Sequence, residues 1–206
     1  MDVLKIHAFN PQLRLISQAA ARIRSGGLIV YPTDSSYAFG CHMGNKTALE
    51  RVRRLRQIDS SHDFTLLCRD LSEIATYALV SNSAYRLLKS LTPGPYTFIL
   101  KAGREVPRRL QNPRRRTIGI RVTDNPIARA LIESLGEPLM TSTLILPGDD
   151  MPLTDAEDIK IRIGNQVDLI IDGGNCGYEM TTVVDLLGEA PVIVRQGKGD
   201  TSMFTQ

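Results

Sequence analysis

The stretch GLIVYPTDSS, residues 27–36, sets a short apolar run directly before a cluster of small polar residues. The run from Leu28 to Tyr31 has the length and composition of a buried β-strand. Polar side chains at a strand end are placed where α/β proteins bind ligands, although such residues also form turns and cap helices. The stretch therefore predicts a buried strand that ends at a candidate ligand site.

A helix is predicted on the N-terminal side of this strand. Asn10 is expected to cap it, Pro11 to occupy its first position and Gly26-Gly27 to end it. The apolar residues between these signals recur at helical spacing and are expected to share one face: Leu13, Ile16, Ala20 and Ile23.

The same alternation of helix and strand continues along the chain and favours a mixed, twisted α/β sheet. Further strands are expected at residues 64–68, 96–100, 117–122, 138–145, 167–171, 181–186 and 191–194. The turn at Gly188 is too short for a parallel crossover, so the last two strands should pair antiparallel. Further helices are expected after caps at Asn45, Asp70, Asn125 and Thr154, and at residues 84–91. Residues 101–116 are expected to form a long loop with one helical turn.

The composition is that of a single compact domain covering residues 1–206, with 42% hydrophobic residues to form a core. The longest apolar runs are far shorter than the roughly 20 residues that cross a bilayer, and no leader sequence is recognisable. We therefore expect a cytoplasmic protein without a membrane partner. Three widely separated cysteines, with no Cys-x-x-Cys pair, predict neither a disulfide framework nor a structural metal site.

Positive charge is concentrated although the formal net charge is only +3. Eight basic residues and one acidic residue, Glu105, lie between Lys101 and Arg121. Such a run is often a solvated surface, but this one precedes a strand with candidate site residues and is therefore a candidate RNA-binding surface. With 5% aromatic residues, backbone or shape recognition is favoured over base stacking. The candidate RNA-binding residues are Arg108, Arg109, Arg114, Arg115 and Arg116.

Hydroxyl residues recur at strand ends, in residues 33–36, 141–143 and 181–182, and arginines stand at element boundaries as Arg56, Arg121 and Arg195. Arginine can hold a phosphate through two parallel hydrogen bonds. One shared anion-binding groove is therefore predicted. A Ser61–His62 catalytic pair is conceivable, but His62 and His42 are better explained as ordinary loop histidines.

Several strings occur in an order that covers nearly the whole chain: GLIVYPTDS at 27–35, PGPYT at 93–97, TIGIR at 117–121, DLIIDGG at 168–174, TVVD at 182–185, and Arg195. Together they closely resemble the YrdC-like domain. Three more strings are similar to its YciO subgroup: FTLLCRDLSE at 64–73, EVPRRL at 105–110 and LPG at 146–148.

The resemblance implies an open, twisted α/β sheet around a concave, positively charged cavity that binds ATP and double-stranded or folded RNA such as tRNA. Synthases of this family convert L-threonine, bicarbonate and ATP into threonylcarbamoyl-AMP and pyrophosphate, for the threonylcarbamoyladenosine modification of tRNA. Mg²⁺ would share the phosphate charge. Carried over by resemblance, Thr33 would contact the amino acid, Thr117 and Arg121 the nucleotide and carboxylate groups, and Arg195 the phosphate or nucleobase side. Thr141 and Thr182 would complete the wall.

The sequence departs from the synthase pattern at two motifs. Synthases carry Lys-x-Arg and Ser-x-Asn where this chain has Arg56-Gln57-Ile58 and Thr143-Leu144-Ile145. Arg56 keeps one cation and Thr143 one hydroxyl, but an isoleucine neither neutralises a phosphate nor forms hydrogen bonds. A shift of two residues would instead align Arg54-Leu55-Arg56 with the first motif.

The main expectation is therefore a YciO-type protein that binds an adenine nucleotide and structured RNA in one basic groove, with reduced catalytic capacity. Two alternatives stay open. The first is an active threonylcarbamoyl-AMP synthase in which Arg54 or another neighbour supplies the missing contacts. The second is a hydrolase or ligase that acts on another acyl-adenylate in the same pocket.

Overall fold

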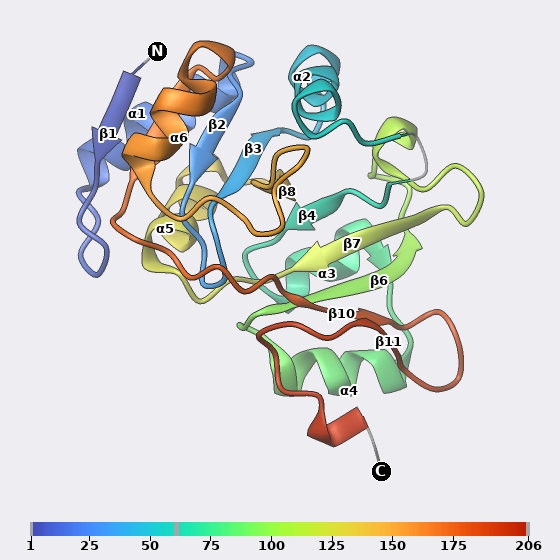
Figure 1. Cartoon of the computed structure of the whole chain (residues 1–206). Helices are drawn as coiled ribbons and strands as arrows, with labels where there is room; N and C mark the ends of the chain where they lie inside the picture. Colours follow the sequence, from blue (N-terminus) through green and yellow to red (C-terminus); the bar gives the residue numbers. More distant parts are fainter. Residues whose placement is uncertain (1, 60–61, 205–206) are drawn as a thin grey trace.

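A computed structural model describes residues 2–59 and 62–204 and folds them around one open mixed sheet (Figure 1). The strands are β1 (Asp2–Lys5), β2 (Ile29–Tyr31), β3 (Ala38–His42), β4 (Thr65–Leu67), β5 (Ala78–Leu79), β6 (Tyr96–Ala102), β7 (Thr117–Arg121), β8 (Leu139–Thr143), β9 (Leu169–Asp172), β10 (Thr182–Asp185) and β11 (Val192–Arg195). Their order across the sheet is β1-β9-β2-β3-β8-β4-β7-β6-β10-β11, with β5 paired to β6. Because the sheet twists strongly, β2 and β6 run in clearly different directions in Figure 1.

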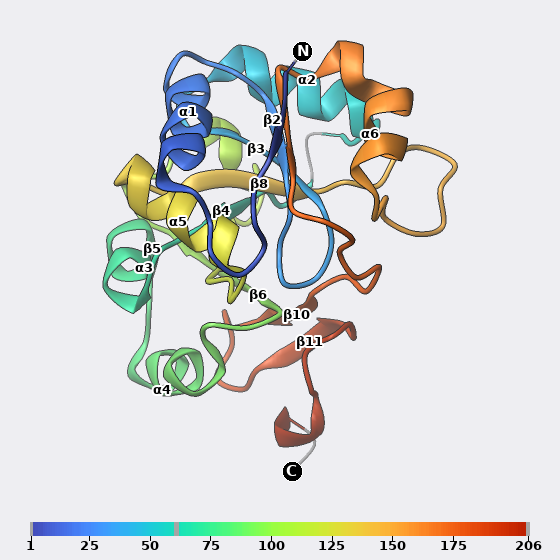
Figure 2. The ribbon, with the colours of Figure 1, turned by 90° about the vertical axis from the view of Figure 1, so that its left-hand side faces the viewer.

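The helices are α1 (Leu13–Arg24), α2 (Lys46–Arg56), α3 (Leu71–Tyr77), α4 (Asn82–Leu91), α5 (Pro126–Leu135) and α6 (Ala156–Ile163), with short 3-10 turns η1 (Arg108–Leu110), η2 (Gly164–Gln166) and η3 (Ser202–Phe204). Apolar residues of α1 and α5 form one core cluster on one face of β2, β8 and β9. Apolar residues of α2, α3, α4 and α6 form a second cluster on the opposite face. Figure 2 shows α1 and α6 on opposite sides of β1.

Most expected elements are present, and the expected α/β class is confirmed. Asn45, Asp70 and Asn125 cap α2, α3 and α5 through their side chains, as predicted. The strands β10 and β11 pair antiparallel, and η1 is the helical turn expected in the basic loop. No helix within residues 2–59 and 62–204 combines the length and apolar character that crossing a membrane requires.

Two predicted caps are wrong. Helix α1 begins at Leu13 after Gln12, because the Nδ1 of His7 accepts the backbone N–H of Asn10 at 3.1 Å and holds it in a turn outside the helix. Helix α6 is capped by Asp155 and not by Thr154. The Asp155 carboxylate accepts the backbone N–H groups of Glu157 and Asp158 at 2.9 and 3.1 Å, and a negative charge is favourable at a helix N-terminus.

Three strands were not expected: β1, β3 and β5. Strand β3 follows β2 closely and contains Gly40, which weakens a strand pattern. Its conformation is set by neighbours on both sides, since it pairs antiparallel with β2 and with β8. Strands β1 and β5 are four and two residues long, too short for a periodicity to be recognised.

Candidate functional site

A cavity of about 350 Å³ lies over the strands β8, β4, β7 and β6. Pairing between these strands places Thr141, Thr65, Gly119 and Ile99 in one row, and these four residues line the cavity floor. A Cβ atom at Gly119 would lie 2.5 Å from the Oγ1 of Thr65, so the floor at this point has no room for a side chain. Because residue 119 is a glycine, no side chain projects into the cavity at the centre of its floor.

Arg195, at the end of β11, forms one wall of the cavity. Its Nε and Nη2 donate to the carbonyl oxygen of Thr181 at 3.1 and 2.9 Å, and Nη2 also donates to the Thr181 Oγ1 at 3.2 Å. The Oγ1 atoms of Thr181 and Thr97 lie 2.9 Å apart. These contacts fix the guanidinium without using any acidic side chain.

Arg56, the last residue of α2, forms the facing wall. The helix ends here because Gln57 adopts the left-handed conformation, with φ of 49°. The Arg56 Nη1 donates to the Oγ of Ser142 at 2.6 Å and lies 3.4 Å from the Nε2 of His62. Its Nε is buried and has no hydrogen-bond partner in the described part of the chain. The Nε–H of Arg56 is therefore a donor that the described residues leave unsatisfied.

The cavity is electropositive. Burial, followed by the charge of Arg195, lowers the pKa of Arg56 to about 10, and burial, followed by the charge of Arg121, lowers the pKa of Arg195. Burial, followed by the charge of Arg56, lowers the pKa of His62 to about 4, so its ring is neutral near pH 7. Within residues 2–59 and 62–204, no carboxylate forms an ion pair with Arg56 or Arg195.

Asp63 is the one acidic residue that the described chain contributes to the cavity lining. Its Oδ1 accepts a hydrogen bond from the Oγ1 of Thr117 at 3.0 Å. The predicted residue Thr117 is fully buried at the start of β7, so it borders the cavity through Asp63 rather than lining it.

Arg121 lies on the same face of β7 as Gly119, but its charge is already neutralised. Its Nη2 forms an ion pair with Asp34 and donates to the Oγ1 of Thr33 at 3.2 Å and to the Oγ of Ser35 at 2.9 Å. Although burial favours the protonated carboxyl, the charge of Arg121 and hydrogen bonds from Asp124 and Thr123 hold the pKa of Asp34 below its ordinary value. The Arg121 side chain is therefore bound to residues 33–35, the polar loop after β2.

The predicted site residues thus divide into three groups. Arg56, Thr141, Thr143 and Arg195 line one cavity. Thr33, Thr117 and Arg121 belong to buried networks beside it. Thr182 lies apart, because its Oγ1 donates to the carbonyl oxygen of Gly199 at 2.7 Å and accepts the Gly197 N–H at 3.0 Å.

Sequence reasoning missed three polar residues that line the cavity: Asp63, Thr65 and Thr97. Each lies in or next to a predicted strand, and alternation along β4 and β6 would have placed Thr65 and Thr97 on a common face with their paired neighbours. The pairing order of the strands, which the sequence did not reveal, was needed to bring them together.

The basic loop divides into two separate surfaces. Arg108 and Arg109 join Arg53 and Arg54 of α2 around an open hollow of about 680 Å³, here called the arginine hollow, whose other lining residues are Glu50, Ile58, Gln111 and Pro113. Arg114, Arg115 and Arg116 are exposed in a turn outside this hollow. Arg115 forms an ion pair with Asp185, which reduces the free charge of the turn.

The synthase-like motif positions also separate in space. Arg54 is exposed and Ile58 half-buried, and both line the arginine hollow rather than the cavity. The shifted alignment therefore does not bring Arg54 to the cavity. Ile145 is half-buried outside the cavity lining, whereas Thr143 of the same motif lines it.

The two histidines lie in different surroundings. His62 lines the cavity and packs edge-on against Phe64, with ring centroids 5.4 Å apart. Its suggested partner Ser61 lies outside the described residues. The Nε2 of His42 lies 3.1 Å from an oxygen of Glu137, outside the cavity lining. No cluster of three or more His, Cys, Asp or Glu side chains suited to a metal ion occurs in the described ranges.

Comparison with known proteins places the chain among relatives of the same size. YciO from Escherichia coli (strain K12) is 56% identical over 199 residues, which are 97% of each chain. Its crystal structure superposes with a TM-score of 0.96 and covers 99% of this chain and 100% of the other.

More distant relatives carry a named activity. The threonylcarbamoyl-AMP synthase of Nitrosococcus oceani is 33% identical over 156 residues, or 75% of this chain and 83% of that protein. The structure of P. abyssi Sua5 complexed with L-threonine is 25% identical, with a TM-score of 0.88, and the match covers 96% of this chain and 58% of Sua5. The family model described as "Telomere recombination", Sua5_yciO_yrdC, matches residues 21–197. The chain therefore belongs to the Sua5/YciO/YrdC family, as its sequence motifs indicated.

Proposed function

We propose that this chain binds an adenine nucleotide or an acyl-adenylate in the cavity, and that its catalytic capacity is reduced relative to the threonylcarbamoyl-AMP synthases of the family. One observation carries the proposal. Arg56 and Arg195 face the same cavity from opposite walls, and neither forms an ion pair with a described carboxylate. A phosphate between them would supply the missing negative charge.

The chemistry of the walls supports this ligand class. Burial and then a neighbouring arginine, Arg195 for Arg56 and Arg121 for Arg195, lower the pKa of both guanidinium groups, so an anion that enters the cavity stabilises their charged forms. A planar guanidinium matches a phosphate through parallel hydrogen bonds, and hydroxyls of Thr141 and Thr143 add neutral contacts. Because Asp63 is the one carboxylate in the described cavity lining, Mg²⁺ would enter with the nucleotide and depend mainly on its phosphates.

Reduced catalysis is proposed because the cavity offers fewer cations than the synthase pattern requires. Ile58 replaces the second cation and lines the arginine hollow, and the exposed Arg54 beside it does not line the cavity. Arg54 therefore does not supply the missing phosphate contact, on which the alternative of an active synthase depended. Each missing charge contact at a phosphate site weakens binding or catalysis by several kcal/mol, on the order of 2–4.

Isothermal titration with ATP and MgCl₂ tests the proposal. Arg195→Ala should weaken binding roughly 30-fold, because a charge-assisted hydrogen bond is lost. Arg86→Ala, a change on the exposed surface of α4, is the matched control and should bind as the wild type does. Wild-type protein that does not bind ATP, or equal affinity in Arg195→Ala, would contradict the proposal.

The reaction alternatives are separated by product analysis. Pyrophosphate formed only when L-threonine and bicarbonate accompany ATP would establish an active synthase. Release of AMP from a supplied acyl-adenylate, without pyrophosphate, would identify a hydrolase. Binding of ATP without either product is the result that the proposal predicts.

Structured RNA is a second proposed ligand, and the arginine hollow is the observation that favours it. Four arginines from α2 and η1 surround it, and one acid, Glu50, lies 3.9 Å from Arg53. The guanidinium of Arg53 lies 4.8 Å from the centre of the Phe64 ring and donates to the carbonyl oxygen of Arg109 at 3.3 Å, which fixes the wall. An open, basic, mostly non-aromatic surface suits the phosphate backbone of a duplex.

Fluorescence anisotropy with a labelled RNA duplex tests this second ligand. Arg108→Ala with Arg109→Ala should weaken binding about tenfold and reduce its dependence on salt. Arg114→Ala with Arg116→Ala, the same charge change in the neighbouring turn, should have a smaller effect. A larger effect of the turn variant would contradict the assignment to the arginine hollow and assign RNA binding to residues 114–116.

A further inference from the structure

A tyrosine hydroxyl reaches the cavity wall from two strands away. Tyr31 belongs to β2 and Thr141 to β8, and β3 lies between these strands in the sheet. The hydroxyl oxygen of Tyr31 lies 2.6 Å from the Oγ1 of Thr141, which lines the cavity. The phenol therefore contacts a residue of the cavity wall but does not line the cavity itself.

Gly40 makes this contact possible. It lies on β3 directly opposite Thr141, and Tyr31 pairs with the neighbouring Ala38. A Cβ atom at residue 40 would lie 2.8 Å from the Cε1 of Tyr31 and 2.8 Å from the Cδ2 of Leu139. The tyrosine ring thus crosses the middle strand over a glycine, and a side chain at this position would displace it.

The buried Tyr31 hydroxyl has one proton to donate, and the described residues offer it one acceptor, the Oγ1 of Thr141. Tyr31 is 0% exposed, and burial, partly offset by its hydrogen bond with Thr141, raises its pKa to about 12, so the hydroxyl is protonated near pH 7. Within the described ranges, the Oγ1 of Thr141 is the hydrogen-bond partner of this hydroxyl. A buried hydroxyl donor without an acceptor is unfavourable, and a phenol is a stronger donor than an aliphatic alcohol.

The direction of this hydrogen bond decides what Thr141 offers to the cavity. If Tyr31 donates, the Oγ1 of Thr141 is the acceptor and its own proton is left to point elsewhere. The cavity is the open side of Thr141, and an anionic ligand there needs donors rather than acceptors.

We propose that Tyr31 is a positioning residue that donates its hydroxyl proton to Thr141 and thereby sets the Thr141 hydroxyl as a hydrogen-bond donor to an anionic ligand in the cavity. This inference rests on the proposed function of the cavity as a nucleotide site. It assigns to the tyrosine of the GLIVYPTDSS stretch a role in ligand binding, although the residue itself is completely buried.

A double-mutant cycle with ATP and MgCl₂ as the probe tests the proposal. Thr141→Val should weaken binding about tenfold, and Tyr31→Phe about fivefold, because each removes or misorients one hydrogen bond to a charged group. In the Thr141→Val background, Tyr31→Phe should have less than a twofold effect, since the hydroxyl that it positions is gone. Thr141→Ser should restore both the affinity and its sensitivity to Tyr31→Phe.

Tyr37→Phe is the matched control, because Tyr37 is also buried and its hydroxyl bonds to the backbone of Gly174 at 2.8 Å, away from Thr141. Its effect should be equal in the wild-type and Thr141→Val backgrounds. Additive effects of Tyr31→Phe and Thr141→Val would overturn the inference, as would unchanged affinity in Tyr31→Phe. If Tyr31→Phe does not fold, equal affinity of Thr141→Val and the wild type overturns it.

The inference and the proposed function fail in different ways. A wild type without ATP binding contradicts the proposed function and, with it, the inference. ATP binding that Arg195→Ala weakens and Tyr31→Phe leaves unchanged contradicts the inference alone.

Discussion

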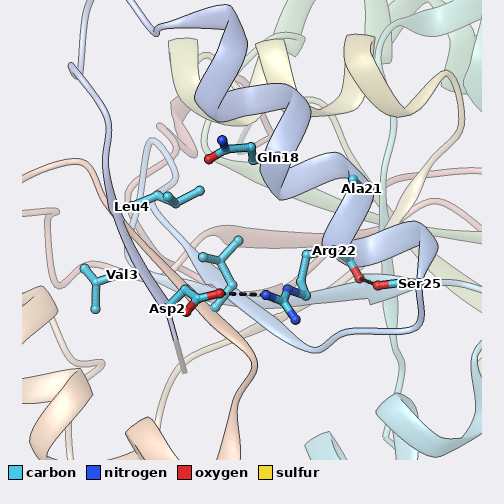
Figure 3. Close-up of a pocket in the computed structure, with 8 residues that line it drawn as sticks. Asp2, Val3, Leu4, Gln18, Ala21, Arg22 and Ser25 are labelled. Atoms are coloured by element: carbon cyan, nitrogen blue, oxygen red, sulfur yellow. Dashed lines mark hydrogen bonds and ion pairs between the residues drawn. The ribbon is translucent and has the colours of Figure 1, made fainter.

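Two concave regions of the molecule differ in what their arginines do. A hollow between β1 and α1, here called the edge hollow, has a volume of about 770 Å³, against about 350 Å³ for the cavity. In the edge hollow, Arg22 forms an ion pair with Asp2 at 2.6 Å, and Figure 3 shows the two side chains pointing toward one another. In the cavity, no carboxylate of residues 2–59 and 62–204 forms an ion pair with Arg56 or Arg195. Unneutralised charge, rather than volume, therefore marks the candidate site.

A second contrast concerns two of the neutralised arginines, Arg121 and Arg22. The Arg121 and Asp34 side chains are 6% and 13% exposed, whereas those of Arg22 and Asp2 are 46% and 60% exposed. Solvent screens the exposed pair, but the buried pair interacts strongly, and removing one partner would leave a buried charge alone.

The largest expected effect is therefore on stability. Asp34→Asn should reduce the free energy of unfolding by about 3 kcal/mol, because Arg121 would remain buried without its counter-ion. Asp2→Asn in the edge hollow should change it by less than about 0.5 kcal/mol. Urea unfolding of both variants measures the difference, and similar losses would show that burial does not separate the two pairs.

The next effect is on ligand affinity. The double variant Arg56→Ala with Arg195→Ala should bind ATP about 100-fold more weakly, because both charged walls are lost. Arg22→Ala removes an equal side chain from the edge hollow and should leave the affinity unchanged. Titration calorimetry decides this, and a loss of affinity in Arg22→Ala would mean that the larger hollow participates in binding.

The cavity floor should be less tolerant of added volume than the surface. Gly119→Ala would place a Cβ atom 2.5 Å from the Thr65 Oγ1 and 3.1 Å from the Phe64 carbonyl oxygen. It should lower stability by about 1–3 kcal/mol. Gly188→Ala, where the nearest atom would be 3.6 Å away, is the control and should have little effect in thermal unfolding. Equal melting temperatures would contradict the tight floor.

The smallest effect is a pH dependence. The pKa of His62 falls from 6.5 to about 4 on folding, so between these values the unfolded chain binds a proton that the folded chain does not. Stability should therefore decrease as the pH falls from 6.5 to 4, by on the order of 1 kcal/mol for this half-buried ring. In His62→Gln this decrease in stability should be smaller. An unchanged pH profile would show that folding does not lower the pKa of His62.

Asp34 acts in a different pH range. Because folding lowers its pKa, its contribution to stability is complete above the ordinary carboxyl pKa and is lost as the pH falls through the lower, folded value. The acid unfolding step below about pH 4 should therefore persist in His62→Gln, which separates the two groups.

The sequence predicted much of the fold because local signals and tertiary packing agree in most elements. Asn45, Asp70 and Asn125 are caps in the structure because each side chain has a free backbone N–H within reach. Strand β3 was missed because its pairing with β2 and β8 overrides a weak local pattern. The cap at Asn10 was wrong because the hydrogen bond from its backbone N–H to His7 Nδ1 holds it in a turn before the helix.

The sequence predicted the chemistry of the site, but it did not predict which of its residues share one cavity and which lie elsewhere. Recurrent arginines and hydroxyls indicated an anion site, and Arg56, Thr141, Thr143 and Arg195 do line one cavity. No sequence pattern indicated that Asp34 would neutralise Arg121, or that residues 108–109 and 114–116 would lie on different surfaces. Both features depend on contacts between distant segments.

Nuclear magnetic resonance of the arginine Nε–H groups tests the central claim most directly. On addition of ATP and MgCl₂, the Nε–H signals of Arg56 and Arg195 should shift, with Arg56 gaining the acceptor that its buried Nε lacks. The signal of Arg22 should stay in place. A shift of Arg22, or no shift of either cavity arginine under saturating ATP, would contradict the account.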